Sequence, residues 1–178
     1  MNKQHKNLFV LALMLCAAAL FAADKSPVQV EVISDDTVRA EFELPCAFDK
    51  AWNVITNYAD SPNVMPNIKK ATIVSTSRSG DDEIAYVDNE AGAGPFTSKY
   101  TVKMTANKKK GTIAWQQTKG SFSKNNGLWK LTSVAANRTQ IVYTATLSHT
   151  LMPDSIKNML VKDSIPDLYE SLKKHTSK

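Results

Sequence analysis

The chain has 178 residues, of which 43% are hydrophobic, and its 22 lysines and arginines modestly exceed its 17 acidic residues. That length suits one domain with a hydrophobic core of its own and leaves little room for a second. The charge is too even for the basic footprint of a nucleic-acid-binding protein, so we expect no nucleic acid among its partners.

The N-terminal segment predicts export. A basic stretch at residues 1–6 precedes an uncharged apolar run over residues 8–22, and small residues follow. Such a run is short for a membrane span and typical of the apolar region of a signal peptide. We therefore expect residues 1–23 to be a signal peptide, cleaved near Ala22 or Ala23. The remaining residues, 24–178, would form a single periplasmic or secreted domain. An uncleaved N-terminal anchor is the alternative.

Cleavage of the signal peptide would also determine which cysteines remain in the protein. Cys16 lies inside the apolar run, but Leu15 precedes it where a lipidation motif needs a small residue. Removal of residues 1–23 takes away Lys3 and Lys6 and leaves Cys46 as the only cysteine, with a net charge of +3. An intramolecular disulfide is then impossible, so we expect the core alone to stabilise the domain.

Strand patterns dominate the middle of the chain. Apolar and polar residues alternate over 28–32 and 38–44, which is the period of a strand with one buried face. Asp35-Asp36 between them predict a turn or a bulge. Pro45 ends the strand, and the spacing of apolar residues predicts a helix over 47–58. Further strands are predicted over residues 71–77, 83–89, 97–106, 111–118, 128–135 and 140–151. Turn signals between them, such as Asn125-Asn126-Gly127, predict antiparallel pairing of successive strands.

The C-terminal pattern predicts a long amphipathic helix over residues 153–174. Pro166 should kink or restart this helix, because proline lacks the amide hydrogen and clashes with the preceding turn. An antiparallel sheet with one apolar face needs a cover, and this helix is the only predicted element long enough to provide it.

Several local motifs accompany this order of elements. They are the strand 38–44 with Pro45, Phe48 and Ala51-Trp52 after it, then 55–58, 65–68, 127–131, the strand through Tyr143, and 165–168. Together, over residues 28–175, they resemble the helix-grip (START-like, SRPBCC) superfamily, and within it the polyketide-cyclase/coenzyme-Q-binding-like branch.

The resemblance implies an α+β helix-grip fold. A curved antiparallel sheet of about seven strands would wrap around the long C-terminal helix, with one or two short helices after the first strand. It also implies a cavity for an apolar ligand, although members of the superfamily range from lipid and sterol carriers to cyclases. The fold alone therefore does not decide the activity.

Catalytic candidates are few. His149 shares a strand face with Tyr143 and is a weak candidate for a base, because a base also needs a positioned partner. We expect His175 to lie in a frayed tail and Cys46 to be buried and inert. Glu41 and Glu43 should face water. No set of histidines and cysteines predicts a metal site, and no cofactor is expected.

The concave face of the sheet offers more candidates, in this case for binding a ligand. Alternation places aromatic side chains there, and we expect about half of them to line a cavity. The segment after the first helix is restricted by Pro62 and Pro66, so Val64 and Met65 between them form either an apolar lip of the cavity or a plug of the core. The predicted ligand-cavity residues are Met65, Tyr100, Trp115, Trp129, Tyr143 and Met159.

The leading hypothesis from these patterns is an exported carrier or sensor for a hydrophobic small molecule, such as a lipid, a quinone or a sterol-like compound. The alternatives are a cyclase or dehydratase that uses His149 with a cavity tyrosine, and a protein-interaction module with a closed core. The Lys108-Lys109-Lys110 turn either contacts an anionic membrane surface transiently or is an ordinary solvated turn. The patterns specify neither the ligand nor an oligomeric state.

Overall fold

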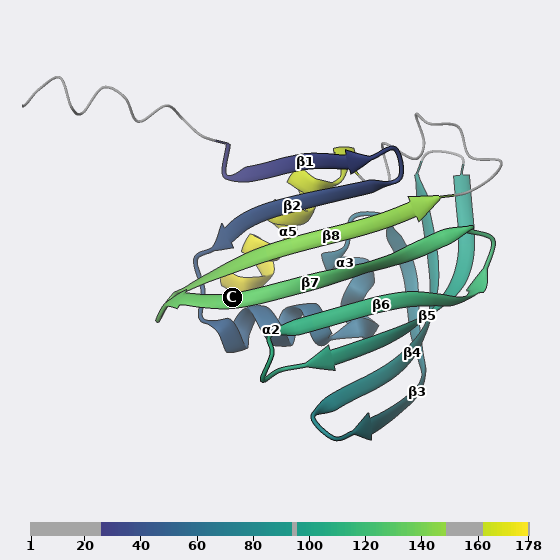
Figure 1. Ribbon diagram of the computed structural model, residues 1–178, viewed down its shortest axis with the longest axis horizontal. Coiled ribbons are helices and arrows are strands. Elements are labelled where there is room, and N and C mark those ends of the chain that lie inside the picture. Colours follow the sequence, from purple (N-terminus) through teal and green to yellow (C-terminus); the bar gives the residue numbers. More distant parts are fainter. Residues whose placement is uncertain (1–25, 94–95, 149–161, 178) are drawn as a thin grey trace, which may run out of the picture.

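Eight antiparallel strands form one curved sheet in the computed structural model, which describes residues 26–93, 96–148 and 162–177 (Figure 1). The strands are β1 (Val28–Ser34), β2 (Thr37–Leu44), β3 (Ile68–Ser79), β4 (Asp82–Ala93), β5 (Phe96–Asn107), β6 (Thr112–Gly120), β7 (Lys124–Ala135) and β8 (Arg138–Ser148). Their order across the sheet is β1-β2-β8-β7-β6-β5-β4-β3, so β2 of the N-terminal hairpin pairs with β8, the last strand of the chain. The count is eight where about seven were expected, because residues 28–44 form a hairpin of two strands.

The helices lie together on one side of this sheet (Figure 1). After β2 come α2 (Phe48–Thr56), a 3-10 turn η1 (Tyr58–Asp60) and the short α3 (Ser61–Val64); α5 (Ile165–Ser177) ends the chain. Phe42 on β2 meets Tyr169 on α5 edge to face, with ring centroids 5.5 Å apart. The predicted α+β class and helix-grip arrangement are confirmed. Among the described residues, no helix is long and apolar enough to span a membrane.

Strand β2 shows how the sequence pattern produces the buried face. Val38, Ala40, Phe42 and Leu44 are all buried, and Glu43 is exposed. Glu41 lies on the outer face as well, where Arg39 Nη2 donates a hydrogen bond to Glu41 Oε2 at 2.7 Å. The predicted outward orientation of both glutamates is therefore confirmed, and the alternate residues supply the core.

Helix α5 begins one residue before Pro166, so the proline lies in the first turn, where its missing amide hydrogen costs nothing. Leu168 and Leu172 of this helix are buried against the rest of the core. The predicted frayed tail is wrong for His175, because its Nδ1 lies 2.8 Å from the Ser171 carbonyl oxygen within the helix. Residues 153–161 of the predicted helix lie outside the described residues.

The turn predicted at Asn125-Asn126-Gly127 is also wrong, because β7 begins at Lys124 and includes all three residues. Asn126 is paired with Gln116 of β6 on one side and with Thr146 of β8 on the other. Pairing on both sides offers the backbone a full set of hydrogen-bond partners, which outweighs the local preference of Asn and Gly for turns.

The buried apolar residues form two clusters. The larger one joins β2, β7 and β8 to α2 and α5, and includes Leu44, Ile141 and Leu172. The smaller one consists of Ala85, Val87 and Val102 on β4 and β5. Tyr58, Met104 and Trp115 pack against both clusters and therefore mark the boundary between them.

Candidate ligand cavity

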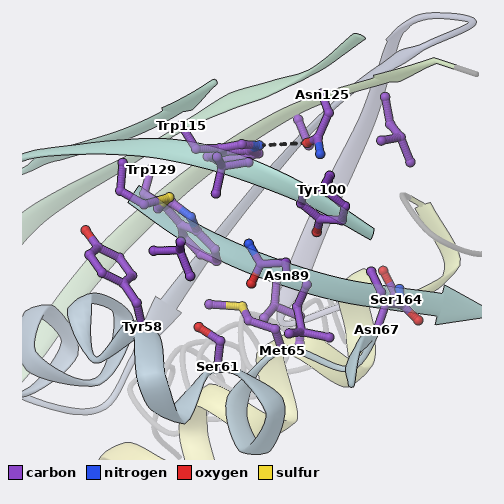
Figure 2. A pocket seen from close by; sticks show the side chains of 18 of the residues that line it. Tyr58, Ser61, Met65, Asn67, Asn89, Tyr100, Trp115, Asn125, Trp129 and Ser164 are labelled. Atoms are coloured by element: carbon purple, nitrogen blue, oxygen red, sulfur yellow. Dashed lines mark hydrogen bonds between the residues drawn. The ribbon is translucent and has the colours of Figure 1, made fainter. Parts of the chain in front are cut away.

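A cavity of about 190 Å³ lies between the concave face of the sheet and the segment from α2 to α3, with Leu168 of α5 also in its wall. Strands β3 to β8 all contribute side chains to its wall, and Figure 2 shows how these converge. The described residues that line it are apolar, aromatic or neutral and polar; no aspartate, glutamate, lysine, arginine or histidine is among them.

One wall of the cavity is aromatic. Trp115 of β6 stacks on Tyr143 of β8, with ring centroids 5.6 Å apart and an angle of 16° between the planes. Trp129 of β7 contacts the same tyrosine at a centroid distance of 4.4 Å. Aromatic pairs in offset or tilted contact add to the stability that burial alone gives, so this wall is a rigid apolar surface.

Gly127 determines where the Trp115 indole lies. The two residues are direct partners in the β6–β7 pairing, and a Cβ atom at Gly127 would collide with Cη2 and Cζ2 of the indole. Because glycine has no side chain, the ring can lie directly over β7. Its Nε1 then donates a hydrogen bond of 3.1 Å to Oδ1 of Asn125, two residues away on the same face of the strand.

Three polar side chains, Asn89, Tyr100 and Asn125, line the cavity from β4, β5 and β7 respectively (Figure 2). Asn89 and Tyr100 are direct partners in the β4–β5 pairing, so their side chains leave the sheet side by side. Burial raises the pKa of Tyr100 to about 12, and the polar side chain of Asn125 nearby offsets part of this effect. Tyr100 therefore keeps its proton at neutral pH.

The other cavity tyrosines behave in the same way. Burial raises the pKa of Tyr143 above its ordinary value, and the nearby Tyr100 adds to the increase. Burial also raises the pKa of Tyr58, with a smaller contribution from Glu83. The hydroxyl of Tyr58 is buried and has no hydrogen-bond partner among the described residues. These groups are neutral hydroxyls at physiological pH and do not act as bases.

Most of the predicted cavity residues lie at the cavity. Tyr100, Trp115, Trp129 and Tyr143 line it, as the alternation of the strands indicated, and Met65 lines it from the segment after α3. Met159 and the weak catalytic candidate His149 lie outside the described residues. Whether any of these six cavity residues contacts a ligand remains a prediction.

Asn89 and Asn125 were missed by the sequence interpretation. Asn89 alternates with the inward-facing Val87 and Ala91, so the period of the strand was enough to place it on the concave face. No comparable signal was available for Asn125, because its position beside Asn126 and Gly127 favoured a turn. Its inward direction depends on the pairing of β7 with two neighbours.

The segment between Pro62 and Pro66 contributes one residue to the core and one to the cavity wall. Val64 is 2% exposed and packs in the larger core cluster, so it closes one end of the core. Met65 is half-buried and lines the cavity. The two residues differ because α3 ends at Val64, and the chain becomes extended at Met65.

The remaining candidates, Cys46 and the lysine turn, make contacts with other residues of the domain. Cys46 is buried, as expected, and its backbone carbonyl oxygen accepts a hydrogen bond of 2.9 Å from the Thr139 hydroxyl. In the lysine turn, Lys108 Nζ lies 2.9 Å from Asp49 Oδ1 and Lys109 Nζ lies 2.7 Å from Asp81 Oδ1. These pairs neutralise part of the charge proposed to contact a membrane, and that contact remains a prediction.

The fold and the cavity agree with the comparison of the sequence with protein families. The model of the family described as polyketide cyclase / dehydrase and lipid transport matches residues 44–173. The match covers well over half of the chain, so the protein belongs to this family, within the START-like (SRPBCC) superfamily that the sequence resembled. No curated protein sequence matches the chain.

Solved structures show the same fold at low sequence identity. The chain is similar to a STAR-related lipid transfer protein from Xanthomonas axonopodis, at 18% identity and a TM-score of 0.65, over 88% of this chain and 97% of that one. It is similar to a START superfamily protein from Mycobacterium smegmatis at 14% identity and a TM-score of 0.66, over 80% and 97%. The Zhui aromatase/cyclase from a Streptomyces species matches at 16% identity and a TM-score of 0.56, over 84% and 87%.

Proposed function

We propose that this protein is a carrier that binds a hydrophobic small molecule in the cavity between β3–β8 and the helices. The observation that carries the proposal is the unfilled space of about 190 Å³ beside the wall formed by Trp115, Trp129 and Tyr143. Ligand sites are typically concave and largely apolar, with a few polar groups that orient the ligand. The lipid-transport description of the family supports a ligand of this kind.

The size of the cavity indicates a compact ligand or the compact end of a longer one. Pockets for drug-sized ligands usually measure about 300–1,000 Å³, whereas an engineered apolar cavity of about 150 Å³ in another protein binds benzene. A cavity of about 190 Å³ therefore suits a ring-sized group. Each 100 Å² of apolar surface that such a group buries contributes about 2.5 kcal/mol before the cost of ordering.

The described geometry favours a carrier over the cyclase or dehydratase alternative. Such an enzyme needs a base, and the raised pKa values of Tyr100 and Tyr143 keep these two residues protonated. The alternative therefore depends on His149. If it were correct, His149→Ala would abolish conversion of the bound compound while leaving the melting temperature nearly unchanged. For a carrier, the compound recovered after incubation is chemically the same as the one supplied.

We also propose that the carrier acts after export, with cleavage near Ala22 or Ala23. The support is the apolar run of residues 8–22 after a basic N-terminus. Mass spectrometry of the protein purified from its native cell envelope should give an N-terminus at Ala23 or Asp24. An intact Met1 on the membrane-bound protein would instead favour the anchor alternative.

The binding proposal is tested by extracting the purified protein with organic solvent and identifying the released compounds by mass spectrometry. The matched variants are Ala145→Leu, which fills the cavity, and Ala114→Leu on the outer face of β6. Wild type and Ala114→Leu should release the same apolar compound, and Ala145→Leu should release little of it. Equal release from all three proteins, or empty wild-type protein whose melting temperature no apolar compound raises, would overturn the proposal.

A further inference from the structure

Three of the polar side chains that line the cavity have a defined place in it. Asn89, Tyr100 and Asn125 come from β4, β5 and β7, and they lie along the cavity beside the Trp115 ring (Figure 2). The pairing of Asn89 with Tyr100 fixes two of them side by side, and the hydrogen bond from Trp115 fixes the third. A cluster held by strands on a packed wall keeps its geometry, which is what a binding site requires.

The Trp115 hydrogen bond determines which way the Asn125 amide faces. An indole Nε1 can only donate, so the Asn125 atom at 3.1 Å from it is the oxygen, Oδ1. The amide nitrogen, which can only donate, then faces away from the indole. It is the group that can lower the pKa of the neighbouring Tyr100, because a donor favours the charged form of the tyrosine oxygen. The hydroxyl proton of Tyr100 remains available to donate to a third group.

Asn89 provides a second donor. Its side chain lines the cavity, is only partly buried, and has no hydrogen bond to any other described residue. Its direct neighbour across the strand pair is Tyr100, so the Asn89 amide and the Tyr100 hydroxyl can reach the same ligand atom. Two adjacent donors on neutral side chains are suited to one acceptor oxygen with two lone pairs.

We propose that Asn89 and Tyr100 bind the carbonyl oxygen of an uncharged, ring-sized ligand group such as a ketone, a quinone or an ester. This inference rests on the proposed carrier function and names the chemical class of its ligand. A carboxylate suits the site poorly, because burying an ionised group requires a partner of opposite charge, and the described lining residues provide none.

Three ring-sized probes that differ in one group test this inference: acetophenone, ethylbenzene and benzoate. Binding is followed by NMR through the indole N–H signals. The chain has three tryptophans, of which Trp115 and Trp129 line the cavity; Trp52 packs on Phe48 in α2 and is the internal reference. Titration of wild type at pH 7 gives one dissociation constant for each probe.

The expected order of affinities depends on the hydrogen-bond donors of Asn89 and Tyr100. In a cavity without them, acetophenone would bind about tenfold more weakly than ethylbenzene or worse, because its carbonyl loses its hydrogen bonds to water. With Asn89 and Tyr100 in place, acetophenone should bind at least as tightly as ethylbenzene. Benzoate should bind more than about tenfold more weakly than acetophenone, because its carboxylate loses hydration without gaining a counter-charge.

The variants Asn89→Leu and Tyr100→Phe should each shift the acetophenone-to-ethylbenzene affinity ratio about tenfold toward ethylbenzene, as the loss of one hydrogen bond requires. Asn126→Leu makes the same kind of change on the exposed outer face of β7 and should leave the ratio unchanged. Retained binding of ethylbenzene shows that each variant is folded and its cavity intact.

The outcomes separate the two proposals. If ethylbenzene shifts the Trp115 and Trp129 signals but acetophenone binds tenfold more weakly, or if the ratio is the same in every variant, the carbonyl inference is wrong and the carrier proposal stands. Benzoate as the tightest ligand at pH 7 would also overturn the inference. If no probe shifts either signal at saturation, the carrier proposal fails and the inference fails with it.

Discussion

The two halves of the sheet use the same kind of strand for different purposes. Between β2 and the helices α2 and α5 the space is filled, and Leu44, Ile141 and Leu172 have no exposed surface. Strands β7 and β8 border both this core and the cavity. Over β4 and β5 only three small residues form a cluster, and the cavity lies beside them. The difference follows from the helices: α2 and α5 insert large side chains into the first half, whereas the short segment η1–α3 faces the second.

This difference teaches that the filled core and the cavity occupy different regions under one sheet, although Trp129, Ala145 and Leu168 belong to the core cluster and also line the cavity. In a fully packed interior, a substitution that changes the volume by even one methylene group is felt. A cavity leaves room for a ligand, but the residues that line it lose packing contacts. The predictions below either break this separation or sharpen it, and they run from the largest expected effect to the smallest.

The sharpest contrast lies between two adjacent residues, Val64 in the packed core and Met65 on the cavity wall. Val64→Asp should prevent stable folding, because an unpaired buried charge costs several kcal/mol. Met65→Asp should leave the protein folded and weaken the binding of apolar probes, since the carboxylate can remain in contact with water at the cavity. Urea denaturation and probe titration measure the two effects, and equal destabilisation of both variants would contradict the division.

Truncation of large side chains compares the two halves directly. Leu172→Ala in α5 should cost about 2–5 kcal/mol of unfolding free energy, because the buried leucine leaves a cavity that its neighbours cannot fill. Met104→Ala should cost less, at or below about 2 kcal/mol, because Met104 already borders empty space. Denaturant unfolding monitored by circular dichroism checks the order, which a larger loss for Met104→Ala would reverse.

Gly127→Ala tests how the cavity is kept open. The added methyl group would collide with the Trp115 indole and with the Thr144 carbonyl oxygen, so the ring and the strand must both shift. Overpacking of this kind typically costs about 1–3 kcal/mol. We expect that loss of stability together with weaker probe binding and a shifted Trp115 indole signal in NMR. Unchanged binding would mean that the position of Trp115 does not shape the cavity.

The smallest effect is expected at Tyr58, between the two halves. Its buried hydroxyl has no hydrogen-bond partner among the described residues, so Tyr58→Phe removes a polar group whose burial is unfavourable. We expect unchanged stability or a gain of up to about 1 kcal/mol, measured by thermal and denaturant unfolding. Phe48→Leu in α2 serves as a control that replaces a packed aromatic ring with a smaller side chain, and it should destabilise the protein. A clear loss in Tyr58→Phe would reveal a partner for its hydroxyl.

Much of the fold could be predicted from local patterns. Alternation over residues 38–44 placed every side chain of β2 on its correct face, and the same rule placed Tyr100, Trp115, Trp129 and Tyr143 on the concave side. The sequence interpretation failed at Asn125 and Gly127, because their turn propensity is local and the pairing of β7 with β6 and β8 is not. It also missed Asn89, although its alternation with Val87 and Ala91 was visible.

The sequence by itself determined the class of fold, the period of each strand and the aromatic character of the inner face, because these depend on residues close together in the chain. Only the tertiary structure decided which half of the sheet is filled. It also brought Asn89 beside Tyr100 and set the Trp115 ring over Gly127 so that it reaches Asn125. These contacts join different strands, and strand register with helix placement, not local propensity, decides which side chains meet.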